Sequence, residues 1–221
     1  MSDPFAVKDC ALLAIATGRH AQNLRELGTH LEEVHTGSIY YHFWGNRLRP
    51  RFEAPEFQND FAAWARFALT DFPLSERLGI IDPTSFADLE ELRREVLDVI
   101  EERLSESEYV PWTKADQQFT FIRSQIVVFD THTRVTKPCE MQALLPNLSV
   151  SSIFYHFIDA RRRLPDGIDD IRFWLSGFDG EYDELRNRLA AVDPYFCSLT
   201  DLRTRLADTF DKCLGTGENE G

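Results

Sequence analysis

A short phrase occurs twice in the chain, first as Ser38–Phe43 (SIYYHF) and again as Ser152–Phe157 (SIFYHF). The two copies lie 114 positions apart and differ only where Tyr40 stands against Phe154. Self-similarity at a fixed spacing is the sequence signature of a repeated fold. The phrase therefore raises two questions: whether the chain is a repeat, and whether its aromatic and histidine side chains form a site.

Further matches follow the same order in both halves. The shift of 114 places Phe5 on Phe119, and a four-residue deletion then aligns Asp60 with Asp170. The remaining matches are Trp64 with Trp174, Arg77–Pro83 with Arg188–Pro194, and Ser85–Arg93 with Ser198–Leu206. We therefore predict four segments: a first repeat unit at 5–104, a polar linker at 105–118, a second repeat unit at 119–214 and a disordered tail at 215–221.

Each unit is predicted to begin with extended chain and to continue as helices. Phe119–Thr131 is rich in β-branched and aromatic residues, which indicates a strand. Its counterpart Phe5–Gly18 is ambiguous, because CALLAIA also suits a helix. Leucines at helical spacing in Ala21–Val34 and an apolar stripe in Ser85–Leu104 predict two helices.

Polar residues at the starts of these segments predict the helix N-caps. Ser38 and Ser152 are expected to cap the helices that carry the repeated phrase, because a serine hydroxyl accepts from an N–H of the first turn. Asp60 is expected to cap the next helix, and Ser85 with Asp88 approximates a capping box.

The predicted fold class is α+β and predominantly α, with two tandem pseudo-symmetric repeats. Each repeat is expected to hold one or two strands followed by about four helices. We expect the halves to pack through their apolar faces about a pseudo-two-fold axis, as a symmetric dimer would. The strands are expected to join into one small sheet.

Charge and composition limit the classes of partner and compartment. The net charge of −13 disfavours nucleic acid and anionic membrane surfaces as partners. The chain has no apolar run of membrane-spanning length and no features of a signal peptide at its start. Its four cysteines show no CxxC spacing, which is typical of reduced thiols in a cytosolic protein. We therefore expect a cytoplasmic protein.

The repeated SI-aromatic-YHF phrase, the NDFxxW motif at Asn59–Trp64, a later RL…DP and a final DL-rich helix together resemble a bacterial family known as a domain of unknown function. The resemblance covers nearly the whole chain. Relatives often lie near genes for sugar-nucleotide glycosyltransferases, so the resemblance implies a carbohydrate-metabolism enzyme as a partner. It implies no activity.

A polar and aromatic set repeats in both halves, and we take it as the candidate ligand-binding set. Its members are Tyr41, His42, Arg47, Asp60 and Trp64 in the first half, and Tyr155, His156, Arg161, Asp170 and Trp174 in the second. Arginines follow the phrase in both halves: Arg47, Arg49 and Arg51, then Arg161, Arg162 and Arg163.

Two interpretations of this set remain open. The histidines could act as acid–base or ligand groups beside arginines that hold a phosphate or carboxylate, with the tryptophans stacking on a sugar. Alternatively, each histidine is a buried structural residue that donates to Asp60 or Asp170. We favour the structural interpretation, because His42 shares a helix face with Ile39 and Phe43.

Motifs for cofactor, metal and nucleophile chemistry are absent from the sequence. It contains no GxSxG, P-loop or GxGxxG. His30, His35 and His42 fit no metal-binding spacing, and the matching positions of the second half do not repeat them. We therefore expect no cofactor and no metal, and the sequence leaves open whether the protein is an enzyme.

Two functions are carried forward. The first is a non-catalytic cytosolic protein-interaction or regulatory protein built from a duplicated unit, whose partner is another protein. The alternative is a binding protein or enzyme for a phosphorylated or sugar-like small molecule, held at the repeat interface by the duplicated His, Asp and Arg residues.

Overall fold

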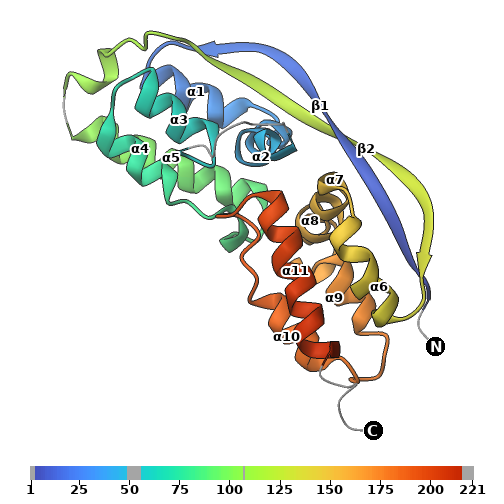
Figure 1. Cartoon of the computed structure of the whole chain (residues 1–221). Helices are drawn as coiled ribbons and strands as arrows, with labels where there is room; N and C mark the ends of the chain where they lie inside the picture. Colours follow the sequence, from blue (N-terminus) through green and yellow to red (C-terminus); the bar gives the residue numbers. More distant parts are fainter. Residues whose placement is uncertain (1–2, 49–55, 107, 216–221) are drawn as a thin grey trace, which may run out of the picture. The chain divides into compact units, whose positions relative to one another are not determined.

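The structure is a computed structural model that describes residues 3–48, 56–106 and 108–215. The fold is α+β and mostly helical, as the sequence predicts. The chain divides into two compact units, shown in Figure 1. One comprises Leu12–Ile126 and is called the α1–α5 unit; the other comprises residues 1–11 and 127–221 and is called the α6–α11 unit.

Two long strands, β1 (Phe5–Ala21) and β2 (Phe119–Val135), form a two-stranded sheet. Thr131 Oγ1 donates to the carbonyl of Val7, and Thr17 Oγ1 donates to that of Phe121, so the strands are antiparallel. Figure 1 shows them side by side. The prediction that the strand segments join into one small sheet is confirmed, and the ambiguous CALLAIA segment is a strand.

Each strand contributes to both units. Phe5 and Val7, near the start of β1, are buried in the α6–α11 unit, and Phe119 and Phe121, near the start of β2, are buried in the α1–α5 unit. Strands usually have 3–10 residues, and each of these has 17. The division between the compact units falls within both strands, after Ala11 in β1 and after Ile126 in β2. The repeat boundaries at 5–104 and 119–214 stay a prediction.

The helices of the α1–α5 unit carry most of its core. They are α1 (Leu24–Glu33), α2 (Thr36–Trp44), the 3₁₀ turns η1 (Gly45–Leu48), η2 (Pro83–Ser85) and η3 (Val110–Trp112), and α3 (Asp60–Phe67), α4 (Phe72–Gly79) and α5 (Leu89–Ser105). Arg93 of α5 donates to the carbonyls of Leu31, Glu32 and Val34 at 2.6–2.8 Å. These bonds join α5 to the C-terminal end of α1.

The α6–α11 unit has a similar succession of elements. They are α6 (Pro138–Leu144), η4 (Leu145–Asn147), α7 (Val150–Ile153), η5 (Phe154–Asp159), α8 (Ala160–Arg163), η6 (Pro165–Gly167), α9 (Asp170–Leu175), α10 (Asp183–Ala190) and α11 (Leu199–Leu214). The η5 segment is a π-helical turn, whereas the matching residues Tyr40–Trp44 are α-helical. The second copy of the phrase is thus wound differently from the first.

The predicted serine caps of the repeated phrase are wrong. The N-caps are His35 for α2 and Ser149 for α7, because each helix begins two residues before Ser38 or Ser152. Both of these serines are buried inside the first turns of their helices. Their hydroxyls are therefore available for the strand that packs against the helix.

Two further predicted caps are also displaced. Asp60 is the first residue of α3, and its predecessor Asn59 caps the helix by accepting from Ala62 N–H at 2.8 Å. The long helix α5 begins at Leu89 with Asp88 as its N-cap, not at Ser85. The predicted apolar stripe is nevertheless present in α5, where Leu92, Val96 and Ile100 are buried.

Candidate functional site

His42 joins three elements of the α1–α5 unit. Its side chain, only 3% exposed, lies on α2, and Nδ1 is 2.8 Å from Asp60 Oδ2 on α3. Nε2 accepts from the backbone N–H of Ile122 on β2 at 3.2 Å. Because a backbone N–H can only donate, the ring proton lies on Nδ1, which donates to Asp60. Asn46 Nδ2 donates to the other oxygen of the same carboxylate.

His156 makes the same connections in the α6–α11 unit. Its Nδ1 is 2.7 Å from Asp170 Oδ2, and its Nε2 accepts from the backbone N–H of Lys8 on β1 at 2.8 Å. Ser152, one helical turn earlier, donates from Oγ to the carbonyl of Lys8. One helix face thus binds both the N–H and the C=O of one strand residue, as a neighbouring strand would.

This arrangement assigns roles to the polar residues of the repeated phrase. An unpaired strand edge leaves backbone donors and acceptors that need partners when they are buried. His156 supplies an acceptor and Ser152 a donor to that edge of β1. In the α1–α5 unit His42 binds the N–H of Ile122, while Ser38 Oγ is buried and has no hydrogen-bond partner among the described residues.

Aromatic residues hold the starts of the strands beside the histidines. The rings of Phe5 and Phe119 lie 4.7 Å from His156 and His42 respectively, measured between centroids. One tryptophan in each unit binds the residues just before the strand through its indole N–H. Trp174 donates to the carbonyl of Asp3 at 3.1 Å, and Trp64 donates to the carbonyl of Gln117 at 2.7 Å. Both tryptophans are buried.

The predicted tyrosines lie beside the histidines. Tyr41 is buried and its ring meets His42 edge-on at 5.2 Å. A Cβ at Gly45 would lie 2.7 Å from the Tyr41 ring, so that ring occupies the space of a side chain at this position. Tyr155 meets His156 edge-on at 5.0 Å, and burial raises the pKa of its hydroxyl.

The trailing arginines take different positions. The guanidinium carbon of Arg47 lies 5.6 Å from the ring centroid of Trp44, and that of Arg161 lies 4.9 Å from the ring centroid of Phe157. Arg161 Nε also donates to the Phe157 carbonyl at 3.2 Å. The other predicted arginines of the first half, Arg49 and Arg51, lie outside the described residues.

Arg163 binds two carboxylates and a backbone carbonyl. Its Nε donates to Asp159 Oδ2 at 2.9 Å, and its Nη2 donates to Asp170 Oδ2 and to the Tyr155 carbonyl, both at 3.0 Å. Its guanidinium carbon lies 4.1 Å from the ring centroid of Tyr155. Arg162 also binds Asp159, whose carboxylate is buried. The side chain of Arg163 is thereby held in one orientation.

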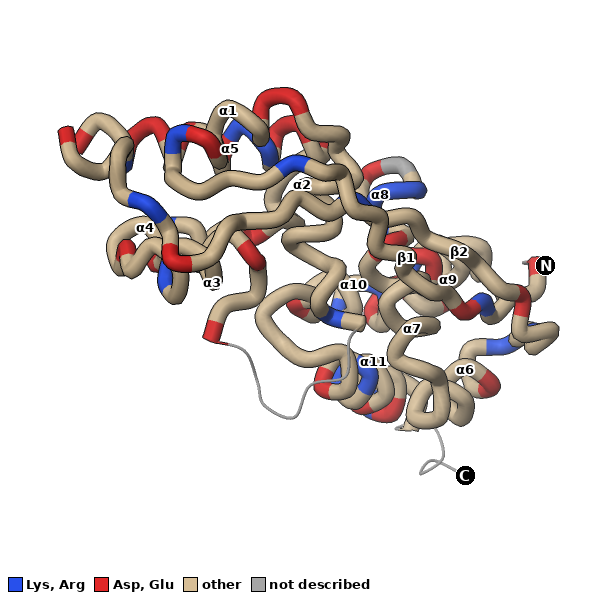
Figure 2. Tube along the Cα trace, turned by 90° about the horizontal axis from the view of Figure 1, so that it is seen from above, with Lys and Arg blue, Asp and Glu red and all other residues tan. Residues whose placement is uncertain are grey.

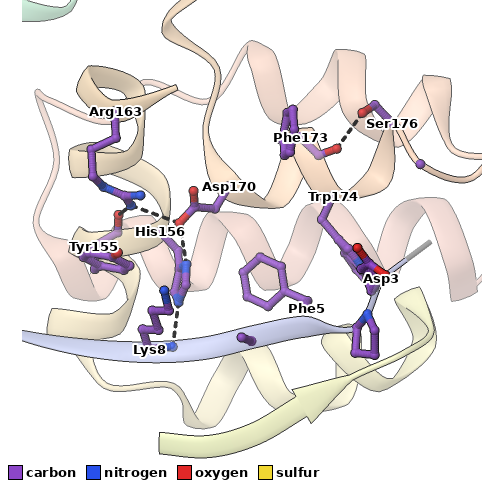
Figure 3. Close-up of a pocket in the computed structure, with 13 residues that line it drawn as sticks. Asp3, Phe5, Lys8, Tyr155, His156, Arg163, Asp170, Phe173, Trp174 and Ser176 are labelled. Atoms are coloured by element: carbon purple, nitrogen blue, oxygen red, sulfur yellow. Dashed lines mark hydrogen bonds and ion pairs between the residues drawn. The ribbon is translucent and has the colours of Figure 1, made fainter. Parts of the chain in front are cut away.

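An open pocket of about 390 Å³ lies in the α6–α11 unit beside His156. The start of β1, η5, the end of α8 and α9 line it, as Figure 3 shows. Four of the ten predicted ligand-binding residues line this pocket: Tyr155, His156, Asp170 and Trp174. Arg163, one of the arginines that follow the repeated phrase, lines it too. The sequence analysis missed Phe5 and Lys8 as site residues, because both lie in the strand rather than in the repeated phrase.

Asp169, next to the site residue Asp170, carries a buried carboxylate. It caps α9 by accepting from Arg172 N–H at 2.9 Å, and its Oδ2 has no hydrogen-bond partner among the described residues. Burial raises its pKa to about 6. At the matching position of the other unit stands Asn59, whose Nδ2 donates to the carbonyl of Leu78 at 2.9 Å.

In the described part of the chain, no three His, Cys, Asp or Glu side chains come together as a metal site would require. The same part contains no helix that is long and apolar enough to cross a membrane. The geometry around the histidines instead consists of hydrogen bonds between protein groups.

Comparison with known proteins identifies a family but no activity. The chain belongs to a family of unknown function, DUF5752, whose model matches residues 2–211. It is similar to "The structure of OrfY from Thermoproteus tenax", with a TM-score of 0.84 and 25% sequence identity over 97% of this chain and 98% of that one. No curated protein matches the sequence.

Proposed function

We propose that this member of the DUF5752 family is a non-catalytic cytoplasmic protein-interaction or regulatory protein, built from a duplicated unit. The observation that carries the proposal is that both ring nitrogens of each histidine already form hydrogen bonds within the protein. Each imidazole donates from Nδ1 to a carboxylate and accepts at Nε2 from a backbone N–H. A histidine that acts as a general base needs a free nitrogen lone pair within reach of the substrate. In His42 and in His156 that lone pair, on Nε2, already accepts from a backbone N–H.

The matching connections support the duplication. In each unit a histidine binds an aspartate and a strand N–H, a phenylalanine ring lies 4.7 Å from the imidazole, and a tryptophan binds the chain before the strand. A duplicated gene keeps residues that define the fold in both halves. The repeated phrase is then explained by folding, without an active site.

Surface charge favours a partner that presents basic residues. Lys and Arg positions lie among Asp and Glu positions on α1 and α5, as Figure 2 shows. Several of these charges are paired, as in Arg93 with Glu90 on α5, and Arg103 of α5 with Asp71, the N-cap of α4. The net charge of −13 still leaves an excess of carboxylates. Such an excess speeds association with a cationic surface and makes the complex sensitive to salt.

The test uses a protein partner identified by cross-linking in cells and then purified. Binding of that partner is measured by calorimetry for the wild type, His42→Gln and His156→Gln, below their melting transitions. The proposal predicts lower melting temperatures with unchanged affinity. If the purified partner binds none of the three proteins, or if either histidine variant loses binding while its melting temperature is unchanged, the proposal is wrong.

A second function is favoured by one specific observation, the open pocket beside His156. We propose as the alternative that the α6–α11 unit binds a phosphorylated or sugar-like small molecule there. Trp174 and Phe5 provide aromatic surface, and Arg163 provides a fixed cation. Pockets of a few hundred Å³ with aromatic walls and a few polar groups are typical of ligand sites.

A further inference from the structure

The pocket of the α6–α11 unit differs from the matching part of the other unit in its chemistry. Lys8 on β1 corresponds to Ile122 on β2, since the two backbone N–H groups bind the matching histidines. Lys8 lines the pocket. Its Nζ has no hydrogen-bond or ion-pair partner in the described part of the chain. A charged side chain therefore stands where the fold itself requires only a backbone N–H.

The helix that faces Lys8 is also different. Phe154–Asp159 forms a π-helical turn, and such turns occur mostly as local bulges that are frequent at functional sites. The turn ends at Asp159, whose carboxylate is 1% exposed and binds Arg162 and Arg163. The corresponding residue of the first copy is Gly45, where the Tyr41 ring excludes a side chain. The second copy of the phrase is thus followed by a buried carboxylate that binds arginines, whereas the first copy is followed by a glycine.

Arg163 is held in place by its partners, and one of its guanidinium nitrogens remains for a ligand. Its Nε and Nη2 bind Asp159, Asp170 and the Tyr155 carbonyl. Nη1 forms no hydrogen bond or ion pair with any described residue, and the side chain remains 30% exposed. An arginine fixed in this way donates to an incoming anion with little further loss of side-chain entropy.

Both cations line the pocket, together with the carboxylate of Asp170. Figure 3 draws Lys8, Tyr155 and Arg163 on one side of Phe5, and Asp3 and Trp174 on the other. At the Lys8 end the facing carboxylate is Asp170, whose Oδ2 already accepts from His156 and Arg163. Arg163 is thus paired with Asp159 and Asp170, while Lys8 adds a positive charge that forms no ion pair with a described carboxylate. A ligand that brings one negative group balances the charge of Lys8.

We propose that this pocket binds a small molecule through an anionic group, a phosphate or a carboxylate, which Lys8 Nζ and Arg163 Nη1 hold, with an apolar or ring-shaped body against Phe5 and Trp174. This inference rests on the alternative function above and specifies its ligand class. It assigns Lys8, which the repeated phrase does not contain, as the residue that distinguishes the binding unit from the other.

The experiment measures the binding of three probes by calorimetry and by NMR shifts of the Lys8 amide. The probes are phenyl phosphate, benzoate and the neutral benzyl alcohol. Lys8→Met removes the ammonium and keeps both the backbone N–H that binds His156 and most of the apolar stem. Lys114→Met makes the same change in charge at an exposed position of the other unit and is the matched control. Lys8→Arg restores a cation.

The proposal predicts saturable binding of an anionic probe in the millimolar range. Lys8→Met should weaken this binding about tenfold, because it removes one charge-assisted hydrogen bond to the anion. Lys114→Met should leave the affinity unchanged and Lys8→Arg should restore it. Phenyl phosphate against benzoate shows which anion the pocket prefers, and either preference supports the proposal.

Two outcomes would overturn it, and they can be told apart. If benzyl alcohol binds as tightly as the anions, and Lys8→Met changes nothing, the pocket holds small molecules without an anion site, and the alternative function survives alone. If no probe binds while the Lys8→Met protein and the wild type melt at the same temperature, the ligand class and the alternative function fail together.

Discussion

The imidazole Nε2 of His156 accepts a hydrogen bond, 2.8 Å long, from the backbone N–H of Lys8, which lies 148 residues earlier in the chain. His42 repeats this relationship with Ile122. Each bond fastens a strand to helices of the same compact unit. These bonds, and the buried charges near them, make the stability of each unit sensitive to single substitutions.

Replacing either histidine should destabilise its unit. In His156→Ala the carboxylate of Asp170 and the N–H of Lys8 lose a partner, and buried polar groups left in this way cost about 1–3 kcal/mol each. Differential scanning calorimetry should show a melting temperature lowered by several degrees. The exposed His20→Ala is the matched control, and an equal drop there would contradict the assignment.

Ser152→Ala should cost less than the histidine change. The serine hydroxyl donates to the Lys8 carbonyl, and alanine cannot replace this bond. We expect a loss of about 1 kcal/mol in the free energy of unfolding. Ser38→Ala is the control in the other unit, where the hydroxyl has no partner among the described residues. Urea unfolding should find Ser38→Ala neutral or stabilising.

Asp169→Asn should stabilise the protein at neutral pH and remove part of its pH dependence. Burial raises the pKa of Asp169 to about 6, so between pH ~4 and ~6 the folded state binds more protons than the unfolded state. Stability from this group is therefore greatest below pH ~4 and is lost as the pH rises through ~6. At pH 7 the cost is about 2–3 kcal/mol, and Asn removes it.

Asn59 provides the reciprocal test of the same position. Its side chain caps α3 and donates to the Leu78 carbonyl, so Asn59→Asp should introduce the cost that Asp169 carries. Urea titrations from pH 4 to 8 should show a steeper fall in stability for this variant than for the wild type. If the stability of the wild type, Asp169→Asn and Asn59→Asp changes with pH in the same way, neither the Asp169 carboxylate nor the one introduced at position 59 is destabilised by burial.

Arg93→Lys should be destabilising despite its retained charge. The guanidinium donates to three carbonyls at the end of α1, at Leu31, Glu32 and Val34. One ammonium cannot reproduce this planar geometry, so we expect a loss of about 1–3 kcal/mol. Arg94→Lys, at an exposed neighbouring position, should change the unfolding midpoint by much less.

Thiol labelling should separate the cysteines by burial. Cys10 lies on β1 with its sulfur 3.4 Å from the Ser151 carbonyl, and burial raises the pKa of its thiol to about 12. The thiolate is the reactive form. At pH 8 iodoacetamide should therefore modify the exposed Cys139 and leave Cys10 unmodified until the protein unfolds. Mass spectrometry of tryptic peptides reads out both sites.

Much of the fold could be predicted from local pattern. The β-branched run at Phe119–Thr131 and the leucine spacing at Ala21–Val34 identify a strand and a helix correctly, since periodicity reports which face is buried. The N-caps predicted at Ser38 and Ser85 each lie three residues from the observed caps, His35 and Asp88. A serine at the start of an apolar run is typical of an N-cap, which is why the sequence predicts caps at these positions. In the structure the Ser152 hydroxyl instead donates to the strand, at the carbonyl of Lys8.

The site could be predicted only in part. The pairing of His42 with Asp60 and of His156 with Asp170 follows from the repeated set, and the structural interpretation anticipated it. Lys8 could not be found in this way, because a strand residue that reaches a helix 148 positions later leaves no local pattern. Its one signal is the contrast with Ile122 under the 114-residue shift.

The position of the ring proton tests the structural assignment of the histidines most directly. Long-range ¹H–¹⁵N correlation NMR at neutral pH distinguishes the two tautomers of His42 and His156. The assignment predicts that both carry the proton on Nδ1, with Nε2 as acceptor, and that the amides of Lys8 and Ile122 exchange slowly with solvent. Protons on Nε2, or rapid exchange of those two amides, would contradict it.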